Sequence, residues 1–430
     1  MENSLVTSIN FWVNGVCTCI VVIIGIILNC CAILIIRRNF ETANIFYQML
    51  ISLLCLDILV LVTWTNLSLV LAFGLEHPVL MHMFPYFSIP STYIAITSST
   101  FMTTAIAFER YLAVRDPLKY SQHMKTPKLQ EKRLRLYLVI VVVLSVIINL
   151  PHFMEFEVRY VDDLTSNNSS INPCKVNELD MNVDNSTNSG SNSSNILFTK
   201  MNRNSKPIIC NTKLGENADY LYYYRFWIRI LITGVIPFGL LVTFNIYIYT
   251  AMKRSAERRH RLTSSATMDL NRTVPSHNIN QNKHFVSGRQ ISMSDSVKRK
   301  DEENLSMAFV GICSVFLICH SLKISLNLMD GLSEKVGATP LNQILGSFSN
   351  LLIVLNSAIN MIIYCVMNNK FRDYFFKSLK NVFSCNIMGD HQSADHFKNV
   401  CQAPITVRTC HSQNQTEVIE MKPNNHCDSE

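Results

Sequence analysis

The sequence predicts an all-α membrane protein: a seven-transmembrane helix bundle with a short amphipathic helix after the last span. Hydrophobic residues make up 48% of the 430 residues and charged residues only 16%, which is too apolar for an ordinary soluble domain. The apolar residues also gather in seven blocks of about 20 residues each, the length that crosses a bilayer as a helix. Since lipid offers the backbone no hydrogen bonds, each block must form a helix that satisfies its own N–H and C=O groups.

The seven blocks are too long for the strands of a membrane barrel, and their spacing is irregular. They define a membrane domain over residues 13–366 and cover residues 13–36, 47–73, 85–112, 136–153, 226–249, 307–329 and 341–366. The first twelve residues have neither a basic start nor a small-residue cleavage site, so we expect the first block to be a retained anchor.

The basic residues predict the orientation of the bundle. Lys and Arg are concentrated in the connectors after the first, third and fifth blocks, as in KRSAERRHR, whereas GLEHPVLMHMF after the second block has neither. Because basic connectors stay in the cytoplasm, residues 1–12 are predicted to be extracellular and the C-terminus cytoplasmic, in the plasma membrane. The net charge of +7 comes largely from this excess of basic residues in the connectors. The expected partner is therefore the lipid bilayer, and nucleic acid is not expected to bind.

Two connectors are long. Residues 157–219, on the outer side, are rich in Asn and Ser and are predicted to form a disordered, glycosylated loop. Its N-x-S/T acceptors are Asn167, Asn168, Asn185 and Asn192. Only Cys174 and Cys210 lie in the oxidising compartment, so we expect them to form a disulfide within this loop. Residues 253–303 form a basic, Ser/Thr-rich cytoplasmic loop.

The segment after the last block is charged and amphipathic. Residues 367–384, which include KFRDYFFKSLK, predict a helix lying along the membrane surface. Cys385 follows directly and is a candidate palmitoylation site. Residues 385–430 are predicted to form a disordered cytoplasmic tail.

Polar residues interrupt several of the apolar blocks. A polar side chain in lipid is costly and usually faces the interior of the bundle, so each one indicates a site. The sequence predicts one buried polar cluster near the middle of the bilayer, formed by Asn29, Asp57, Ser99, Asn356 and Asn360. The alternative is that each residue makes a separate hydrogen bond between helices.

The third span ends in AFERYLAVRDPLKY, in which Arg110 stands between Glu109 and Tyr111. ERY followed by DPL, an Asp in the second span, an Asn in the first, Pro237 in the fifth, and N-x-x-x-Y before KFRDYFFKSL resemble rhodopsin-like G-protein-coupled receptors. The resemblance covers nearly the whole spanning region. Within that superfamily, NLPHFMEFEV, IPFGLLVTFNIYIY, FLICHSLKISLNLMD and LNSAINMIIY are similar to invertebrate FMRFamide-type neuropeptide receptors.

The resemblance implies a receptor that transmits binding of an amidated extracellular peptide of FMRFamide type to a heterotrimeric G protein. Arrestin and receptor kinases are further implied partners. The sequence has no nucleophile and base at catalytic spacing, no phosphate-binding loop and no metal cluster, so an enzyme is not expected. A receptor for a non-peptide ligand is one alternative. A small-solute transporter is the other, with Asp57 and Lys323 as its charges, although the spans show no paired repeat.

The resemblance also implies roles for single residues in switching. Asp57, Ser99, Asn356 and Asn360 would form an allosteric sodium site, the only cofactor expected. Arg110 would be a gate, held by Glu109 and Glu303 at rest and released when the sixth helix moves. Tyr364 would stabilise the opened state near Arg110. The implied switch residues are Glu109, Arg110, Tyr111, Glu303, Asn356, Asn360 and Tyr364.

The ligand is expected at the outer ends of the helices. An Arg-Phe-amide peptide needs an acidic partner for its guanidinium and an aromatic slot for its Phe. The candidate ligand-binding residues are Thr92, Tyr93, Glu155, Tyr223, Trp227, Lys323 and Asp330. Thr92 stands where amine receptors have an Asp, which disfavours a biogenic amine. For Lys323 three readings remain open: it snorkels, it faces an acidic group of the ligand, or it pairs with Glu155.

The sequence departs from the superfamily pattern at three points. No Cys occurs near the outer end of the third span, where Pro85 stands. The sixth span has Ser321 and Lys323 in place of the usual Trp and Pro. Met361 stands where most relatives have a proline that kinks the seventh helix, so a straighter seventh helix is predicted.

Overall fold

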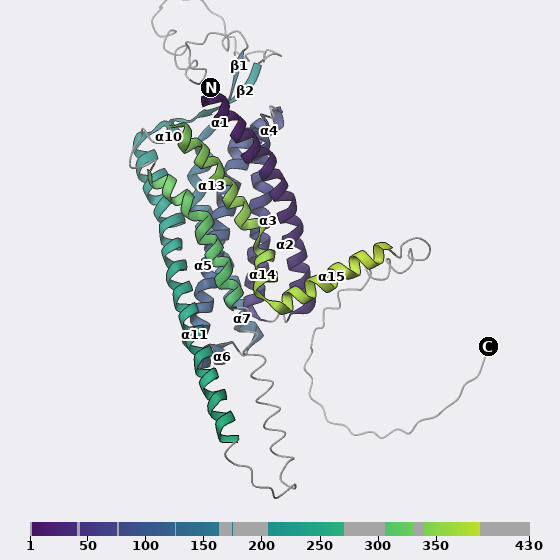
Figure 1. Cartoon of the computed structure of the whole chain (residues 1–430). Helices are drawn as coiled ribbons and strands as arrows, with labels where there is room; N and C mark the ends of the chain where they lie inside the picture. Colours follow the sequence, from purple (N-terminus) through teal and green to yellow (C-terminus); the bar gives the residue numbers. More distant parts are fainter. Residues whose placement is uncertain are drawn as a thin grey trace, which may run out of the picture. The chain divides into compact units, whose positions relative to one another are not determined.

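The structure, a computed structural model, describes residues 2–40, 44–74, 77–124, 126–162, 174, 205–270, 306–329 and 339–387. The described residues are mainly helical and include one antiparallel hairpin, β1 and β2 (Figure 1). The chain divides into two units, Met1–Phe376 and Lys377–Glu430. All the membrane helices belong to the first unit.

The first membrane helix begins earlier than predicted. It runs without interruption through α1 (Glu2–Asn10), η1 (Phe11–Cys17) and α2 (Thr18–Asn39), and residues Ser4–Asn39 are apolar enough to cross a membrane. The polar residues among the first twelve concealed this extension in the sequence. The next two membrane helices are α3 (Ile45–Leu71) and α5 (Ile89–Arg115), and α4 (Pro78–Met83) and η2 (Phe84–Ser88) lead into α5.

The later helices follow the predicted order. They are α6 (Pro117–His123), α7 (Pro127–Asn149) with η3 (Leu150–Met154), η4 (Tyr220–Ile228) with η5 (Ile230–Val235) and α11 (Ile236–Leu270), a helix over Ser306–Met329, α13 (Pro340–Ala358), α14 (Asn360–Met367) and α15 (Asn369–Ile387). α11 continues to Leu270, so the connector predicted to begin at residue 253 begins as a helix. α15 matches the predicted amphipathic segment and includes Cys385.

The described part of the chain contains five helices long and apolar enough to cross a membrane, and a sixth if α13 and α14 count as one bent span. α5 completes the bundle of seven. It is 27 residues long, but its Ser- and Thr-rich stretch TSSTFMTT makes it less apolar than the others. It tolerates this composition because it lies inside the bundle, packed against α3, α7 and α11.

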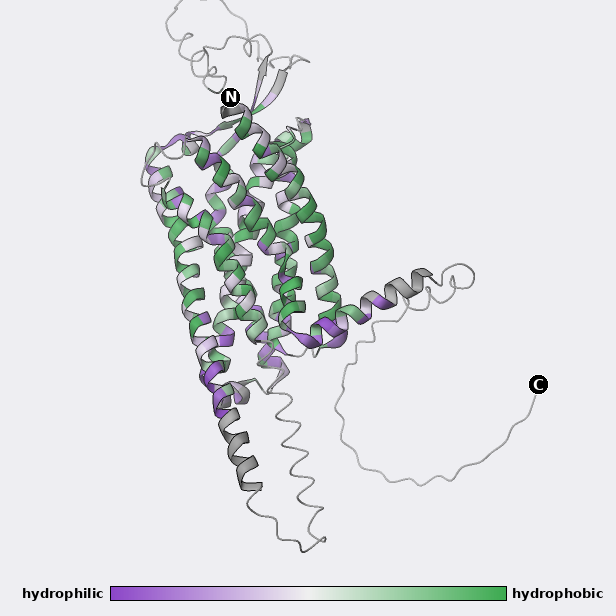
Figure 2. Ribbon diagram, in the orientation of Figure 1, coloured by the Kyte–Doolittle hydropathy of each residue, from purple (hydrophilic) through white to green (hydrophobic). Residues whose placement is uncertain are grey.

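The core of the bundle is largely apolar. Met49, Leu53, Ile106 and Phe309 are each buried in one cluster that joins α3, α5 and the helix over Ser306–Met329. The outward faces of the helices are apolar as well, and Figure 2 shows hydrophobic residues along most of the membrane helices, with hydrophilic residues near the lower end of α11. Apolar side chains on both faces are what a helix surrounded partly by lipid requires.

The long connector before η4 contains structure that was not predicted from the sequence. β1 (Phe156–Asp162) and β2 (Ser205–Asn211) pair antiparallel, with Glu157 opposite Cys210. The alternation in FEVRYVD is a strand signal that the Asn/Ser-rich composition further along obscured. A disulfide joins Cys174 to Cys210. The four candidate glycosylation sites, the cytoplasmic tail after residue 387, Glu303 and Asp330 lie outside the described residues.

The seventh membrane helix is bent, so the prediction of a straighter helix is wrong. α13 and α14 meet at 54°, with Ile359 between them at φ −96° and ψ 0°. The Asn29 Nδ2 atom donates a hydrogen bond to the Ser357 carbonyl oxygen at 2.8 Å. In a regular helix that oxygen would accept from the Met361 N–H. A side chain that inserts into the helical hydrogen-bond ladder bends a helix as proline does, so Asn29 supplies here what Met361 cannot.

Gly25 allows α2 to approach the bent helix closely. A Cβ atom at Gly25 would lie 2.6 Å from the Ala358 Cβ and 2.9 Å from the Leu61 Cδ1. Gly239 in α11, by contrast, has nothing within 4 Å of the corresponding position. Small residues drive helix association in membranes because they let backbones approach.

We expect Gly25→Leu to destabilise the bundle by about 1–3 kcal/mol, because the larger side chain must separate α2 from Ala358. The melting temperature of the detergent-purified protein measures this effect. Gly239→Leu, the matched control, should leave the melting temperature nearly unchanged. Equal melting temperatures for the two variants would show that this contact does not limit stability.

Candidate functional site

The buried acid of α3 is the centre of a polar cluster. Asp57 is completely buried. The Ser99 hydroxyl of α5 donates to its Oδ1 at 2.7 Å, and the Asn360 amide of α14 donates to its Oδ2 at 2.6 Å. The Ser357 side chain is a third hydrogen-bond partner. Three helices therefore meet at one carboxylate.

The cluster differs from its prediction at one position. Ser357 takes the place next to Asp57 that Asn356 was expected to hold, and Asn356 is buried nearby. The prediction assumed a regular helix, in which residues four apart share a face, and the bend at Ile359 breaks that alignment. Asn29 joins the cluster through the Ser357 carbonyl, and its own Oδ1 is buried without a partner among the described residues.

The donor set of this cluster suits a small hard cation. Sodium binds oxygen ligands, and the cluster offers a carboxylate and the hydroxyls of Ser99 and Ser357. The unpartnered Oδ1 of Asn29 adds one more oxygen close by. The residues present therefore fit a sodium ion.

Near the C-terminal end of α5, Glu109 is fully buried, and both of its carboxylate oxygens have partners. Its Oε2 lies 3.0 Å from the Arg133 guanidinium of α7 and accepts from the Tyr137 hydroxyl at 2.8 Å. Its Oε1 accepts from the Tyr120 hydroxyl of α6 at 2.9 Å. Burial raises the pKa of Tyr120, and the adjacent Glu109 carboxylate adds to this although Arg110 opposes it, so the hydroxyl remains a donor at neutral pH.

Glu109 does not hold Arg110, as the sequence analysis expected. Neighbouring residues in a helix point about 100° apart, so these two side chains diverge. The Arg110 guanidinium instead lies over the Phe46 ring, 4.1 Å from its centroid, as a cation–π contact with α3. Its Nε is buried without a hydrogen-bond partner in the described part of the chain. The second expected partner, Glu303, is not among the described residues.

The two remaining switch residues are aromatic. Tyr364 is almost completely buried, its ring lies 5.6 Å from the Phe371 ring, and its hydroxyl has no partner among the described residues. Tyr111 lies 5.2 Å from the Phe244 ring and 4.8 Å from the Tyr247 ring, which packs α5 on α11. Neither hydroxyl hydrogen-bonds to Arg110 in the described part of the chain.

A cavity of about 1050 Å³ lies at the end of the bundle that carries the hairpin. Among the predicted ligand-binding residues, Thr92, Tyr93, Glu155 and Lys323 line it. Tyr223 and Trp227 do not, and Tyr222 and Phe226 line it instead. Tyr223 and Trp227 were predicted as aromatic residues near the outer ends of the helices, and that criterion does not tell which face of the π-helical η4 points inward.

Glu155 lines this cavity, and both of its carboxylate oxygens already have hydrogen-bond partners. It is buried, its Oε2 lies 2.8 Å from the His152 Nδ1, and its Oε1 accepts from the Tyr220 hydroxyl at 2.7 Å. Burial alone would raise the pKa of Glu155, but these partners outweigh it and lower the pKa to about 2. Lys323 donates instead to the Asn350 Oδ1 at 3.4 Å, so the predicted Lys323–Glu155 pair is wrong.

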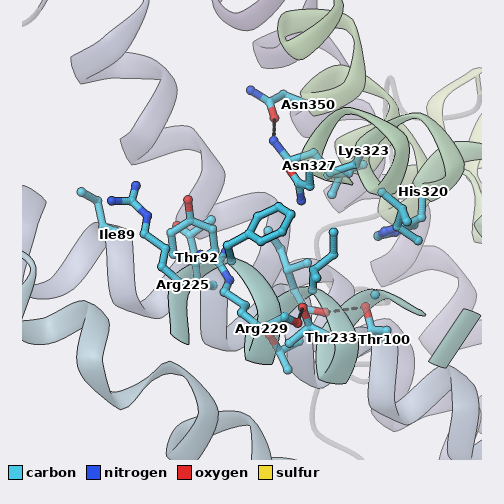
Figure 3. Close-up of a pocket in the computed structure, with 18 of the residues that line it drawn as sticks. Ile89, Thr92, Thr100, Arg225, Arg229, Thr233, His320, Lys323, Asn327 and Asn350 are labelled. Carbon is cyan, nitrogen blue, oxygen red and sulfur yellow. Dashed lines mark hydrogen bonds between the residues drawn. The ribbon is translucent and has the colours of Figure 1, made fainter. Parts of the chain in front are cut away.

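The sequence analysis missed several residues that line the cavity. Figure 3 shows Lys323 and His320 on one side and Arg225 and Arg229 on another. Arg229 lies 4.0 Å from the Tyr93 ring centroid. A cation within an apolar block indicates a site, and this rule would have found Arg229. Arg225 was less visible because it falls just before the predicted start of its block at residue 226.

Comparisons with known proteins agree with this arrangement. Residues 28–189 and 189–364 match the profile of the family described as 7 transmembrane receptor (rhodopsin family). The sequence is 24% identical over 407 residues to the FMRFamide receptor of Drosophila melanogaster, covering 91% of this chain and 57% of that protein. It is also 24% identical over 206 residues to the Sex peptide receptor of Drosophila melanogaster, covering 47% of this chain and 39% of that protein. This chain thus spans less than two thirds of the length of either relative.

We expect Glu109→Gln to destabilise the protein by about 1.5–3 kcal/mol, because it removes a charged acceptor shared by α6 and α7. The melting temperature in detergent should fall accordingly. The control is Glu131→Gln: Glu131 pairs with Arg135 at 3.5 Å on an exposed surface, where such pairs contribute little. A melting temperature that falls equally in both variants would argue against a specific role for the Glu109 contacts.

Proposed function

The chain belongs to the rhodopsin family of seven-transmembrane receptors, and from that premise we propose that it transmits binding of an extracellular amidated neuropeptide of FMRFamide type to a heterotrimeric G protein. The observation that carries the proposal is the cavity of about 1050 Å³ at one end of the bundle, with Arg110 near the other end of α5. α5 connects the two, because Thr92 and Tyr93 line the cavity and Arg110 lies five turns further along.

The size and lining of the cavity support a peptide ligand. Pockets for small molecules occupy roughly 300–1000 Å³, so this cavity is large enough for several residues of a peptide. Phe226, Phe238 and Phe316 offer aromatic surface for a Phe side chain. The hairpin contributes Phe156 and Ile209, so a bound peptide contacts both the helices and the outer loop. The names of the two similar Drosophila proteins are also those of peptide receptors.

The proposed mechanism uses the helix over Ser306–Met329 as the moving part. His320, Lys323 and Asn327 of this helix line the cavity, and Phe309 lies in the core near the opposite end. A ligand that prefers one position of this helix shifts the population toward that position. Movement at its cytoplasmic end exposes a groove beside Arg110 that accepts an amphipathic helix of the G protein. In this orientation the N-terminus is extracellular and α15 lies at the inner membrane surface, where arrestin and receptor kinases act.

We also propose that Asp57, Ser99 and Ser357 bind a sodium ion in the resting state. The ion would supply a positive charge to a carboxylate that has no cationic partner among the described residues. Asn360 holds the carboxylate in place from α14, so a shift of α14 alters the ion site. The ion therefore favours one arrangement of the bent helix over another.

We expect Arg110→Ala to abolish peptide-stimulated nucleotide exchange on the G protein while peptide binding persists. Membranes from cells that express the chain are screened with amidated peptides, including Arg-Phe-amide peptides, by labelled GTP-analogue binding. Arg135→Ala is the control, because Arg135 is exposed and pairs with Glu131 on the surface of α7. Silence toward every peptide, together with transport of a labelled solute, would refute the receptor function.

We expect sodium to stabilise the wild-type protein more than potassium at equal ionic strength, because a ligand of the folded state raises its stability. The melting temperature of the purified protein in the two salts measures the difference. In Asp57→Asn the difference should vanish, since the neutral amide no longer attracts the ion. The same difference between salts in both proteins would exclude a sodium site at Asp57.

A further inference from the structure

The cavity is rich in cations and poor in free acids. Arg225, Arg229 and Lys323 line it, whereas Glu155 is its only acidic residue within the described residues. All three cations act electrostatically on Tyr93, and they face the cavity from two sides (Figure 3). The described lining therefore carries three positive charges against one negative charge.

That one negative charge is already in use. His152 and Tyr220 hydrogen-bond to the two carboxylate oxygens of Glu155, and its exposed fraction is 1%. Glu157, the acid on the neighbouring strand, is bound by Arg159 at 2.6 Å. Neither acid offers a free carboxylate to a ligand guanidinium.

The cations, by contrast, lack ionic partners. No ion pair joins any of the three to a carboxylate in the part of the chain that the structure describes. Arg229 lies over the Tyr93 ring at 4.0 Å and Arg225 lies 6.0 Å from the Phe156 ring. Lys323 has only a long hydrogen bond of 3.4 Å to Asn350. Aromatic faces hold the arginine planes in position, and because Arg229 uses one hydrogen bond on Tyr93, its other N–H groups and those of Arg225 are the ones left for a ligand.

We propose that Arg225, Arg229 and Lys323 form an anion site that binds a carboxylate of the ligand, so that the receptor selects a peptide carrying an Asp or Glu side chain. The site rests on the proposed function, because it assigns the chemistry that the cavity recognises. A guanidinium fork binds a carboxylate through two parallel hydrogen bonds, and partial burial strengthens this attraction. The arginine of an Arg-Phe-amide end is repelled from this part of the cavity and lies elsewhere in the complex.

The test uses three matched peptides, each offered to cells that express the full chain. The first is an amidated peptide with one Asp, the second has Asn in its place, and the third has Asn and a free C-terminal carboxylate. Labelled-peptide binding and G-protein nucleotide exchange are measured for each. We expect the Asp peptide to be at least about tenfold more potent than the Asn amide.

Variants assign that preference to the three cations. Arg225→Gln, Arg229→Gln and Lys323→Gln should each shrink the Asp-over-Asn ratio to about threefold or less, mainly by weakening the Asp peptide. Arg229→Lys keeps a charge and should retain part of the ratio, which separates loss of charge from misfolding. Lys213→Gln is the matched control, because Lys213 of α10 (Lys213–Glu216) is exposed and does not line the cavity. Antibody labelling of intact cells checks that every variant reaches the surface.

Each outcome decides a different question. A ratio near one in the wild type, with peptides still active, overturns the anion site and leaves the receptor function standing. A preference for the free C-terminal acid supports the anion site and assigns its carboxylate to the chain end, which overturns the side-chain source. If no amidated or acidic peptide binds or activates, the proposed function and the anion site fail together.

Discussion

The buried carboxylate of Asp57 is the constraint on which the rest of the bundle depends. A carboxylate cannot stay in an apolar core without donors, so α5 must bring Ser99 to it and α14 must bring Asn360. These contacts fix the depth of both helices against α3. The seventh helix meets Asp57 just beyond its bend, and the hydrogen bond from Asn29 to the Ser357 carbonyl lies at that bend. The polar cluster and the shape of the last membrane helix are therefore one feature.

Much of this arrangement follows from the sequence. Seven apolar blocks predict seven helices, and the cost of a polar group in lipid was sufficient to bring Asp57, Ser99 and Asn360 together. The helix ends were harder, because α1 and the extension of α11 to Leu270 contain polar residues that do not look like membrane segments. Hydropathy identifies the segment of a helix that lies in lipid, but it does not predict how far the helix continues beyond the bilayer.

The remaining errors arise where a helix departs from α-helical geometry or where a contact joins distant segments. Asn356 was placed beside Asp57 by a spacing that the bend at Ile359 changes, whereas Tyr223 was placed in the cavity only as an aromatic residue near the outer end of its helix. Glu109 was paired with its neighbour Arg110, but its partner Arg133 is 24 positions further along the chain. Pairing across helices depends on how the bundle packs, which local sequence patterns do not contain.

The disulfide between Cys174 and Cys210 has a consequence for access to the cavity. Both cysteines follow β1 in the chain, and the sequence has no cysteine between residues 56 and 173, so no disulfide ties the hairpin to α4 or α5. The described contacts between the β1–β2 hairpin and α4 or α5 are noncovalent, such as the one between His82 and Tyr160. Separating the hairpin from α4 or α5 would therefore break no disulfide bond. The two hairpin residues that line the cavity, Phe156 and Ile209, owe their position against these helices to noncovalent packing.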